Sequence, residues 1–96
     1  LLQISDIPRL RQIADKHNIT LVVDNTFSPL ILSPIALGAH IVVYSMTKFI
    51  NGKNDTTAGA ICADMDFINS LIDLNEGSSM LLGGVLDSIR AANIHK

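Results

Sequence analysis

The chain has 96 residues, of which 48% are hydrophobic, 17% charged and 4% aromatic, with a formal net charge of −2. This length allows at most one domain, and the scattered basic residues exclude the clustered positive surface of a nucleic-acid or anionic-membrane binder. No apolar run approaches the ~20 residues of a membrane span. We therefore expect an apolar part of a larger α/β polypeptide, incomplete at both ends, with strands covered on both faces.

Residues 6–17 are predicted to form an amphipathic surface helix. Ser5 or Asp6 can cap its free amides, and Pro8 is tolerated in its first turn. The apolar residues of this segment recur at three- and four-residue steps: Ile7, Leu10, Ile13 and Ala14. Residues 20–23 follow as a strand that is too continuously apolar to be half exposed.

The next strand is expected over residues 39–44. Before it, residues 25–33 are a loop, Ser33 and Pro34 open a short helix, and Gly38 closes that helix. Because the crossover contains a helix, the two strands should be parallel. Residues 49–56 form a second loop, and residues 57–63 a third strand.

Two more helices are predicted towards the carboxyl end. Asp64 or Asp66 can cap the first, in which Phe67, Leu71 and Leu74 share one face and Gly77 is the stop. A flexible connection over residues 78–84 leads to the last helix, whose apolar residues are Val85, Leu86, Ile89 and Ala92. Cys62 lies in an apolar run and is expected to be a buried structural thiol.

The first two strands end in polar residues that can do chemistry. The first is followed by Asp24, and the second by Ser45, Thr47 and Lys48. Since parallel strands present their carboxyl ends at one edge of a sheet, we expect an acid and an amine to lie near each other there. Ser45 and Thr47 alternate, so on an extended segment both hydroxyls can reach one phosphate.

Four segments occur in a fixed order: VVDNTF (22–27), LGAHIVV (37–43), SMTKFING (45–52) and AGA (58–60). The ordered set is far more specific than any one segment. It resembles the Cys/Met-metabolism family of pyridoxal-phosphate enzymes, which includes cystathionine γ-synthases, cystathionine lyases, methionine γ-lyases and O-acylhomoserine sulfhydrylases. The resemblance is strongest over residues 20–60.

The resemblance implies a fold, a cofactor and partners. Residues 1–96 would be part of the pyridoxal 5'-phosphate-binding large domain of a fold-type I enzyme, a partial three-layer αβα sandwich. The third strand would be antiparallel to the others. The full-length enzyme would be a cytoplasmic homo-oligomer, a dimer of dimers, acting on a small amino-acid substrate. A ring-stacking aromatic residue and a substrate-binding arginine would come from flanking sequence and a neighbouring subunit.

The resemblance also assigns roles to individual residues. Lys48 matches the lysine that holds the cofactor covalently and moves protons, and Asp24 matches the carboxylate that faces the pyridine nitrogen. Ser45 and Thr47 match phosphate contacts. Thr26 either packs under the ring or steadies Asp24. Taken singly, each residue also has an ordinary interpretation, as a solvated lysine, a turn aspartate or a locally bonded hydroxyl.

These assignments predict elimination or replacement at Cβ or Cγ of an amino acid such as cystathionine, methionine or an O-acylhomoserine. Two alternatives stay open: a Schiff-base lyase that uses Lys48 without a cofactor, and a non-catalytic homologue that keeps the fold for assembly. No metal is expected, because His17, His40 and His95 lack ligand-like spacing. His40 should be a surface or packing residue, and Arg90 should be exposed to solvent.

The chain departs from the family pattern at three places. It has Gly52-Lys53-Asn54-Asp55 where Gly-His-Ser-Asp is usual, and Tyr44 where histidine is frequent. Residues 82–84 lack a proline that is often found nearby. Lys53 could lower the pKa of the Lys48 amine, or it could simply project into water. These departures are compatible with the expected cofactor binding, but they leave the substrate subclass open.

Overall fold

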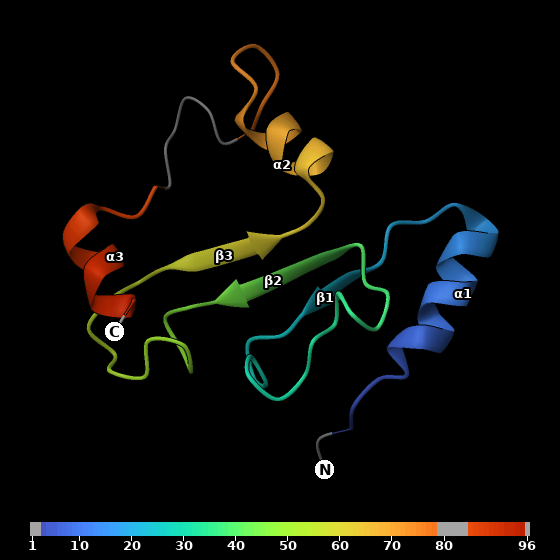
Figure 1. The fold of residues 1–96 in the computed structure, drawn as a ribbon, viewed down its shortest axis with the longest axis horizontal. Helices are drawn as coiled ribbons and strands as arrows, with labels where there is room; N and C mark the ends of the chain where they lie inside the picture. Colours follow the sequence, from blue (N-terminus) through green and yellow to red (C-terminus); the bar gives the residue numbers. More distant parts are fainter. Residues whose placement is uncertain (1–2, 79–84, 96) are drawn as a thin grey trace.

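The computed structural model describes residues 3–78 and 85–95. Its elements are α1 (Ile7–His17), β1 (Val22–Asp24), β2 (Ile41–Ser45), β3 (Gly59–Cys62), α2 (Met65–Ile72) and α3 (Ser88–Ile94). The strands form one sheet in the order β1-β2-β3, and the helices lie around it (Figure 1). The predicted α/β class is confirmed. None of the described helices has the length and apolarity needed to cross a bilayer.

Strand β2 is the centre of the sheet. It pairs with β1 in parallel, with Asp24 opposite Val43, and with β3 antiparallel, with Ser45 opposite Gly59. Both directions agree with the sequence predictions. The parallel pairing brings the carboxyl ends of β1 and β2 to one edge of the sheet.

Alternation of side chains along the strands gives the sheet two different faces. On one face, Val42 is fully buried and packs with Ile7 of α1 and with Ala39. The other, which we call the open face, carries the side chains of Val22, Asp24, Val43, Ser45 and Ile61. On this face Ile41 is buried, at 9% exposure, whereas Val22 is 53% exposed and Ile61 47% exposed. The prediction that the first strand is buried on both sides is therefore wrong for the described residues.

Helix α1 confirms the predicted amphipathic helix. Asp6 accepts a hydrogen bond from the Arg9 N–H at 3.1 Å, and Asn18 ends the helix in the left-handed conformation. The predicted apolar face is only partly covered. Ile7 and Ala14 are buried, whereas Leu10 and Ile13 are 40% and 50% exposed.

The short helix predicted over residues 34–38 is wrong. This segment forms consecutive turns, in which the N–H groups of Leu37 and Gly38 donate to the carbonyls of Pro34 and Ile35 at 3.1 and 3.0 Å. Gly38 has a φ of +107°, which reverses the chain only four residues after Pro34 and leaves no room for a full α-helix. The strands on either side are parallel nonetheless.

Helix α2 is shorter than predicted. Asp64 caps it by accepting from the Phe67 N–H at 2.7 Å, as expected. The helix ends at Ile72 because Asp73 accepts from the next two free N–H groups and starts a turn. Leu74 therefore lies outside the helix, and Gly77 is not its stop.

Helix α3 begins later than predicted. Asp87 is its N-cap and accepts from the Arg90 N–H at 2.9 Å, so Val85 and Leu86 precede the helix. Apart from Ser78, the predicted connection over residues 78–84 lies outside the described residues, as do the proline-lacking residues 82–84.

Cys62 is exposed, so the prediction of a buried thiol is wrong. It lies at the end of β3, which is an edge strand of the described sheet. The small core around Val42 does not extend over this strand.

Gly38→Ala is expected to lower the free energy of unfolding of the full-length protein by about 1–3 kcal/mol. The φ of +107° strains an alanine, and the added Cβ would lie 3.1 Å from the Arg11 Cγ. Gly52→Ala is the matched control, because its φ is +67° and the nearest atom is 3.8 Å away. Urea unfolding measures both losses, and equal losses would contradict the crowding at Gly38.

Candidate functional site

The predicted acid and amine are connected by three consecutive hydrogen bonds at the carboxyl edge of the sheet. The Lys48 Nζ donates to the Ser45 Oγ at 3.4 Å, which is a long contact. The Ser45 N–H donates to the Thr26 Oγ1 at 2.8 Å, and the Thr26 N–H donates to the Asp24 Oδ1 at 2.9 Å. Four of the five predicted site residues therefore belong to one connected group.

The side chains of this group face the same side of the sheet. Asp24 pairs with Val43, and Ser45 lies two residues beyond Val43, so Asp24 and Ser45 both project from the open face. The contact with the Ser45 Oγ brings the Lys48 amine to that face as well. The arrangement places a carboxylate and an amine at one edge of one surface.

Lys48 is carried by a tight turn that follows β2, and we call residues 46–51 the lysine turn. The Lys48 N–H donates to the Ser45 carbonyl at 3.1 Å, and the Asn51 N–H donates to the Met46 carbonyl at 2.9 Å. Asn51 is buried, and its Nδ2 donates to the Asp55 Oδ1 at 2.9 Å. The backbone of the turn is thus fixed, while the lysine side chain stays exposed.

Asp24 is held in its ionised form. The pKa of Asp24 lies below its ordinary value of 3.8, chiefly because the side chain of Thr26 hydrogen-bonds it and also because the Thr26 N–H does so. Burial has little effect, since Asp24 is exposed. Thr26 is only 7% exposed. The bond from the Thr26 N–H to Asp24 is the contact expected if Thr26 steadies Asp24.

Thr47 is placed differently from the sequence expectation. Strand β2 ends at Ser45, so Thr47 lies in the lysine turn and not on an extended segment. Its Oγ1 accepts from the Ala58 N–H at 2.9 Å and donates to the Ala58 carbonyl at 3.2 Å. Thr47 therefore joins the lysine turn to the residue before β3. The Ser45 hydroxyl differs, because its hydrogen has no acceptor among the described residues.

Asn25 is a structural residue of the site that sequence analysis did not single out. It is 2% exposed, and its Nδ2 donates to the carbonyls of Ser28 and Leu32 at 3.2 and 2.9 Å. Its Oδ1 accepts from the Ser28 Oγ at 2.8 Å. Asn25 thus holds the loop that follows β1. The tendency of asparagine to bond to nearby backbone was the available signal.

Phe27 and Phe49 form a second link between the two loops. Their ring centroids are 5.4 Å apart at an interplanar angle of 54°. Aromatic pairs favour such a tilted arrangement over a face-to-face one. Both rings are largely exposed. Each phenylalanine directly follows a site residue, Thr26 or Lys48. That shared position was a signal for their pairing.

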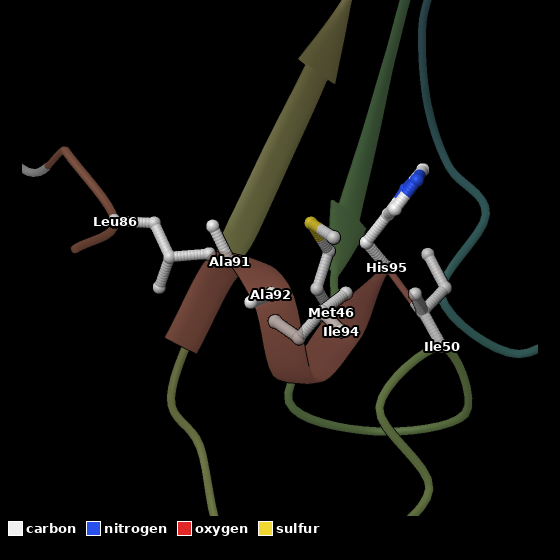
Figure 2. A pocket seen from close by; sticks show the side chains of 7 residues that line it. All are labelled: Met46, Ile50, Leu86, Ala91, Ala92, Ile94 and His95. Atoms are coloured by element: carbon white, nitrogen blue, oxygen red, sulfur yellow. The ribbon is translucent and has the colours of Figure 1, made fainter. Parts of the chain in front are cut away.

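An open apolar hollow of about 740 Å³ lies between the lysine turn and α3. Figure 2 shows Met46 and Ile50 of the lysine turn together with the side chains of α3 that line it. None of the five predicted site residues lines this hollow. The residues of the connected group therefore lie at the sheet edge and not inside this cavity.

The remaining candidates have structural contacts. Arg90 is exposed, as predicted, and pairs with Asp87 at 3.1 Å. His40 is a packing residue, as predicted, since its Nδ1 accepts from the Leu21 N–H at 2.9 Å. Within residues 3–78 and 85–95, no three His, Cys, Asp or Glu side chains are grouped closely enough to hold a metal ion.

Thr26→Val is expected to raise the pKa of Asp24 towards 3.8, because the side-chain hydrogen bond is lost. Thr26→Ser keeps the hydroxyl and should keep the pKa low. Carbon NMR titration of aspartate-labelled full-length protein measures both. Because the folded pKa is lowered, Asp24 stabilises the fold above the unfolded pKa and loses this effect as pH falls below about 4. An unchanged Asp24 pKa in the valine variant would contradict the assigned cause.

Comparison with known proteins places these residues in a described family. A sequence model of the Cys/Met metabolism PLP-dependent enzymes matches residues 1–96. The chain is 46% identical over 87 residues to the methionine gamma-lyase of Arabidopsis thaliana, covering 91% of the chain and 20% of that protein. It is 45% identical over 82 residues to the cystathionine beta-lyase MetC of Staphylococcus haemolyticus, covering 83% and 21%.

Solved structures give the same result. The structure is similar to that of a protein described as cystathione gamma lyase from Micromonospora echinospora, with a TM-score of 0.84 and 30% identity over 98% of this chain and 24% of that one. It is also similar to the cystathionine gamma synthase of Xanthomonas oryzae pv. oryzae, with a TM-score of 0.70 and 40% identity over 74% and 19%. The chain thus spans about a fifth of the length of the relatives it matches.

Proposed function

The chain belongs to the Cys/Met metabolism family of PLP-dependent enzymes, and from this premise we propose what its full-length protein does. It catalyses elimination or replacement at Cβ or Cγ of a sulfur-containing or O-acylated amino acid of the cystathionine, methionine or homoserine-ester class. The observation that supports this most is the hydrogen-bonded group from Lys48 to Asp24 on the open face. This group contains an amine, a hydroxyl and a carboxylate, which are the kinds of side-chain group that could bind the aldehyde, the phosphate and the ring nitrogen of pyridoxal phosphate.

The residues present fit the three polar parts of pyridoxal phosphate. Lys48 offers an exposed amine to its aldehyde, and Asp24 offers a carboxylate to its ring nitrogen. Ser45 offers a hydroxyl hydrogen that no described residue accepts, so it can donate to the phosphate. Thr47 can do the same by leaving the Ala58 carbonyl, the longer of its two contacts, while the Ala58 N–H keeps its oxygen in place.

The chemistry divides between the cofactor and the chain. When bound, pyridoxal phosphate supplies a ring that accepts the electrons of a substrate carbanion. Lys48 holds this cofactor and moves protons, and its flexible stem on a fixed turn lets the Nζ reach more than one atom. Asp24, which Thr26 keeps ionised, would favour the protonated form of the cofactor's ring nitrogen. The family resemblance suggests these roles, and the contacts of Lys48 and Asp24 support them.

The finer parts of the proposal concern the whole protein. We place residues 1–96 within its large cofactor-binding domain of fold-type I, and we place the protein in the cytoplasm as a homo-oligomer, a dimer of dimers. Leu30 and Ile31, in the loop after β1, are 97% and 89% exposed and give a surface that further chain or a neighbouring subunit can cover. Relatives include both lyases and synthases, so the proposal stays with the Cβ/Cγ class.

The proposal predicts which lysine carries the cofactor. After the full-length protein is mixed with pyridoxal phosphate and reduced with borohydride, peptide mapping should find the adduct on Lys48. Lys48→Ala should abolish the adduct and the visible absorbance of lysine-bound cofactor, because no other amine contacts the Ser45 Oγ in the described chain. Lys53→Ala is the matched control, five residues away on an exposed loop, and should keep both.

The same experiment separates the alternatives. An adduct on Lys53, or none, would contradict the site assignment, and the absence of any adduct would favour a non-catalytic homologue that keeps the fold. Borohydride trapping of substrate on Lys48 without pyridoxal phosphate would favour a Schiff-base lyase that needs no cofactor. Absorbance and mapping decide between these outcomes without a measurement of turnover.

Asp24→Asn is expected to lower kcat by roughly 10²–10³, because the charge that stabilises a protonated ring nitrogen is removed. Asp66→Asn is the control, since Asp66 lies in the first turn of α2, away from the sheet edge, and should leave kcat unchanged. Steady-state kinetics with cystathionine, methionine and an O-acylhomoserine measure both variants. A kcat in Asp24→Asn equal to that of the unaltered protein would contradict the role of Asp24.

A further inference from the structure

His40 and Leu21 are joined by reciprocal hydrogen bonds at the start of the sheet. The His40 N–H donates to the Leu21 carbonyl at 3.0 Å, and the Leu21 N–H donates to the His40 Nδ1 at 2.9 Å. The second bond uses the lone pair of the imidazole. It fastens the connection between α1 and β1 to the residue that precedes β2.

The second bond exists only while Nδ1 carries no proton. A charged imidazole has hydrogens on both ring nitrogens, so it donates at both and accepts at neither. The Leu21 N–H would then face another donor. Rotating the ring does not restore the bond, because the other nitrogen is protonated too.

A charged ring has a second partner within reach. The Asp15 Oδ1 of α1 lies 3.9 Å from the His40 Nε2, which is too far for a hydrogen bond but close enough to attract a cation. Asp15 also accepts from the Arg11 Nε at 2.7 Å, so its charge is partly offset. The connection of residues 18–21 contributes no charged group here. Asp15 and Arg11 are therefore the charged groups that face His40 from the described elements.

The surroundings leave space for the ring to move. A cavity of about 140 Å³ lies beside it, lined by Ala14, Asp15, Asn18, Ile19, Thr20 and His40. The His40 side chain is 31% exposed, so solvent protons reach it. Arg11 fastens the neighbouring Gly38 by donating from Nη1 to its carbonyl at 2.9 Å, and this bond does not depend on the imidazole.

We propose that His40 is a proton-sensitive latch. Its neutral ring binds the Leu21 N–H and fastens the α1–β1 connection to the sheet. Its charged ring turns to Asp15 and releases that N–H, while the backbone bonds from His40 and Ile41 to the Leu21 carbonyl keep the strands in register. Histidine is the side chain that ordinarily changes charge between pH 5 and 8, and this is the range over which the latch is tested. This inference does not depend on the proposed catalytic function.

The test is hydrogen–deuterium exchange of the full-length protein at pH 7.5, 6.5 and 5.5, resolved to single amides and corrected for the intrinsic exchange rate. The Leu21 amide should lose protection by about tenfold as pH falls, the size expected for one lost hydrogen bond. The His40 amide, which bonds to the Leu21 carbonyl, is the internal control and should keep its protection. Equal behaviour of the two amides would overturn the proposal.

His40→Asn is the matched variant, because the asparagine Oδ1 takes the place of Nδ1 as an acceptor and does not titrate. In this variant the protection of Leu21 should be the same at all three pH values. Asp15→Asn removes the carboxylate that attracts the charged ring. In this variant the loss of Leu21 protection should occur at a lower pH than in the unaltered protein. A loss of Leu21 protection in His40→Asn with the same pH dependence would also overturn the proposal.

Discussion

The hydroxyl of Thr26 holds the two strand ends of the candidate site together. The last backbone bond between β1 and the following strand runs from the Asn25 N–H to the Val43 carbonyl at 3.0 Å. Beyond it, the Thr26 Oγ1 accepts from the Ser45 N–H and takes the place of the next rung. It keeps the chain that follows Asp24 beside the end of β2, near the spacing of adjacent strands, about 4.8 Å. The acid and the amine of the site owe their shared position to this bond.

Polar contacts more than apolar burial fix the edge of the sheet. The apolar core is small and lies under the other face, around Ile7, Ala39 and Val42. The buried polar residues all lie in segments that follow β1 or β2: Asn25, Thr26, Asn51 and Thr56. A buried polar side chain that finds its partners tolerates little displacement, because each broken bond leaves an unpaired group. The loop that follows Asp24 is ordered in this way by Asn25 and Thr26, and the lysine turn is ordered by the bond from the Asn51 Nδ2 to Asp55.

Local signals predicted the three strands and the caps at Asp6 and Asp64, because a cap or an apolar run acts within a few residues. The antiparallel direction of β3 was implied by the family resemblance, and the parallel direction of the first two strands was predicted from a crossover helix that the structure replaces with turns. Features that depend on distant contacts were missed. The bond of Thr47 to Ala58 spans eleven residues and requires that β2 end at Ser45, which no local pattern indicates. The exposure of Cys62 likewise depends on what covers an edge strand. Four of the five predicted site residues were brought together, because the parallel pairing of β1 and β2 places their carboxyl ends at one edge of the sheet.

Two of the departures from the family pattern, Tyr44 and Lys53, lie in the described chain, and neither belongs to the connected group. Tyr44 alternates with Ser45, so it points to the core face, where its hydroxyl lies 3.5 Å from the Asn25 Nδ2. Lys53 is exposed, and its charge acts on Asp55, where it adds slightly to the lowering of the pKa that the Asn51 amide causes. Neither residue contacts the Ser45 hydroxyl or the Asp24 carboxylate in the described structure. Tyr44 and Lys53 are thus distinct from the residues that would hold the cofactor. A chain can therefore differ from the family pattern at Tyr44 and Lys53 and keep the connected group in place.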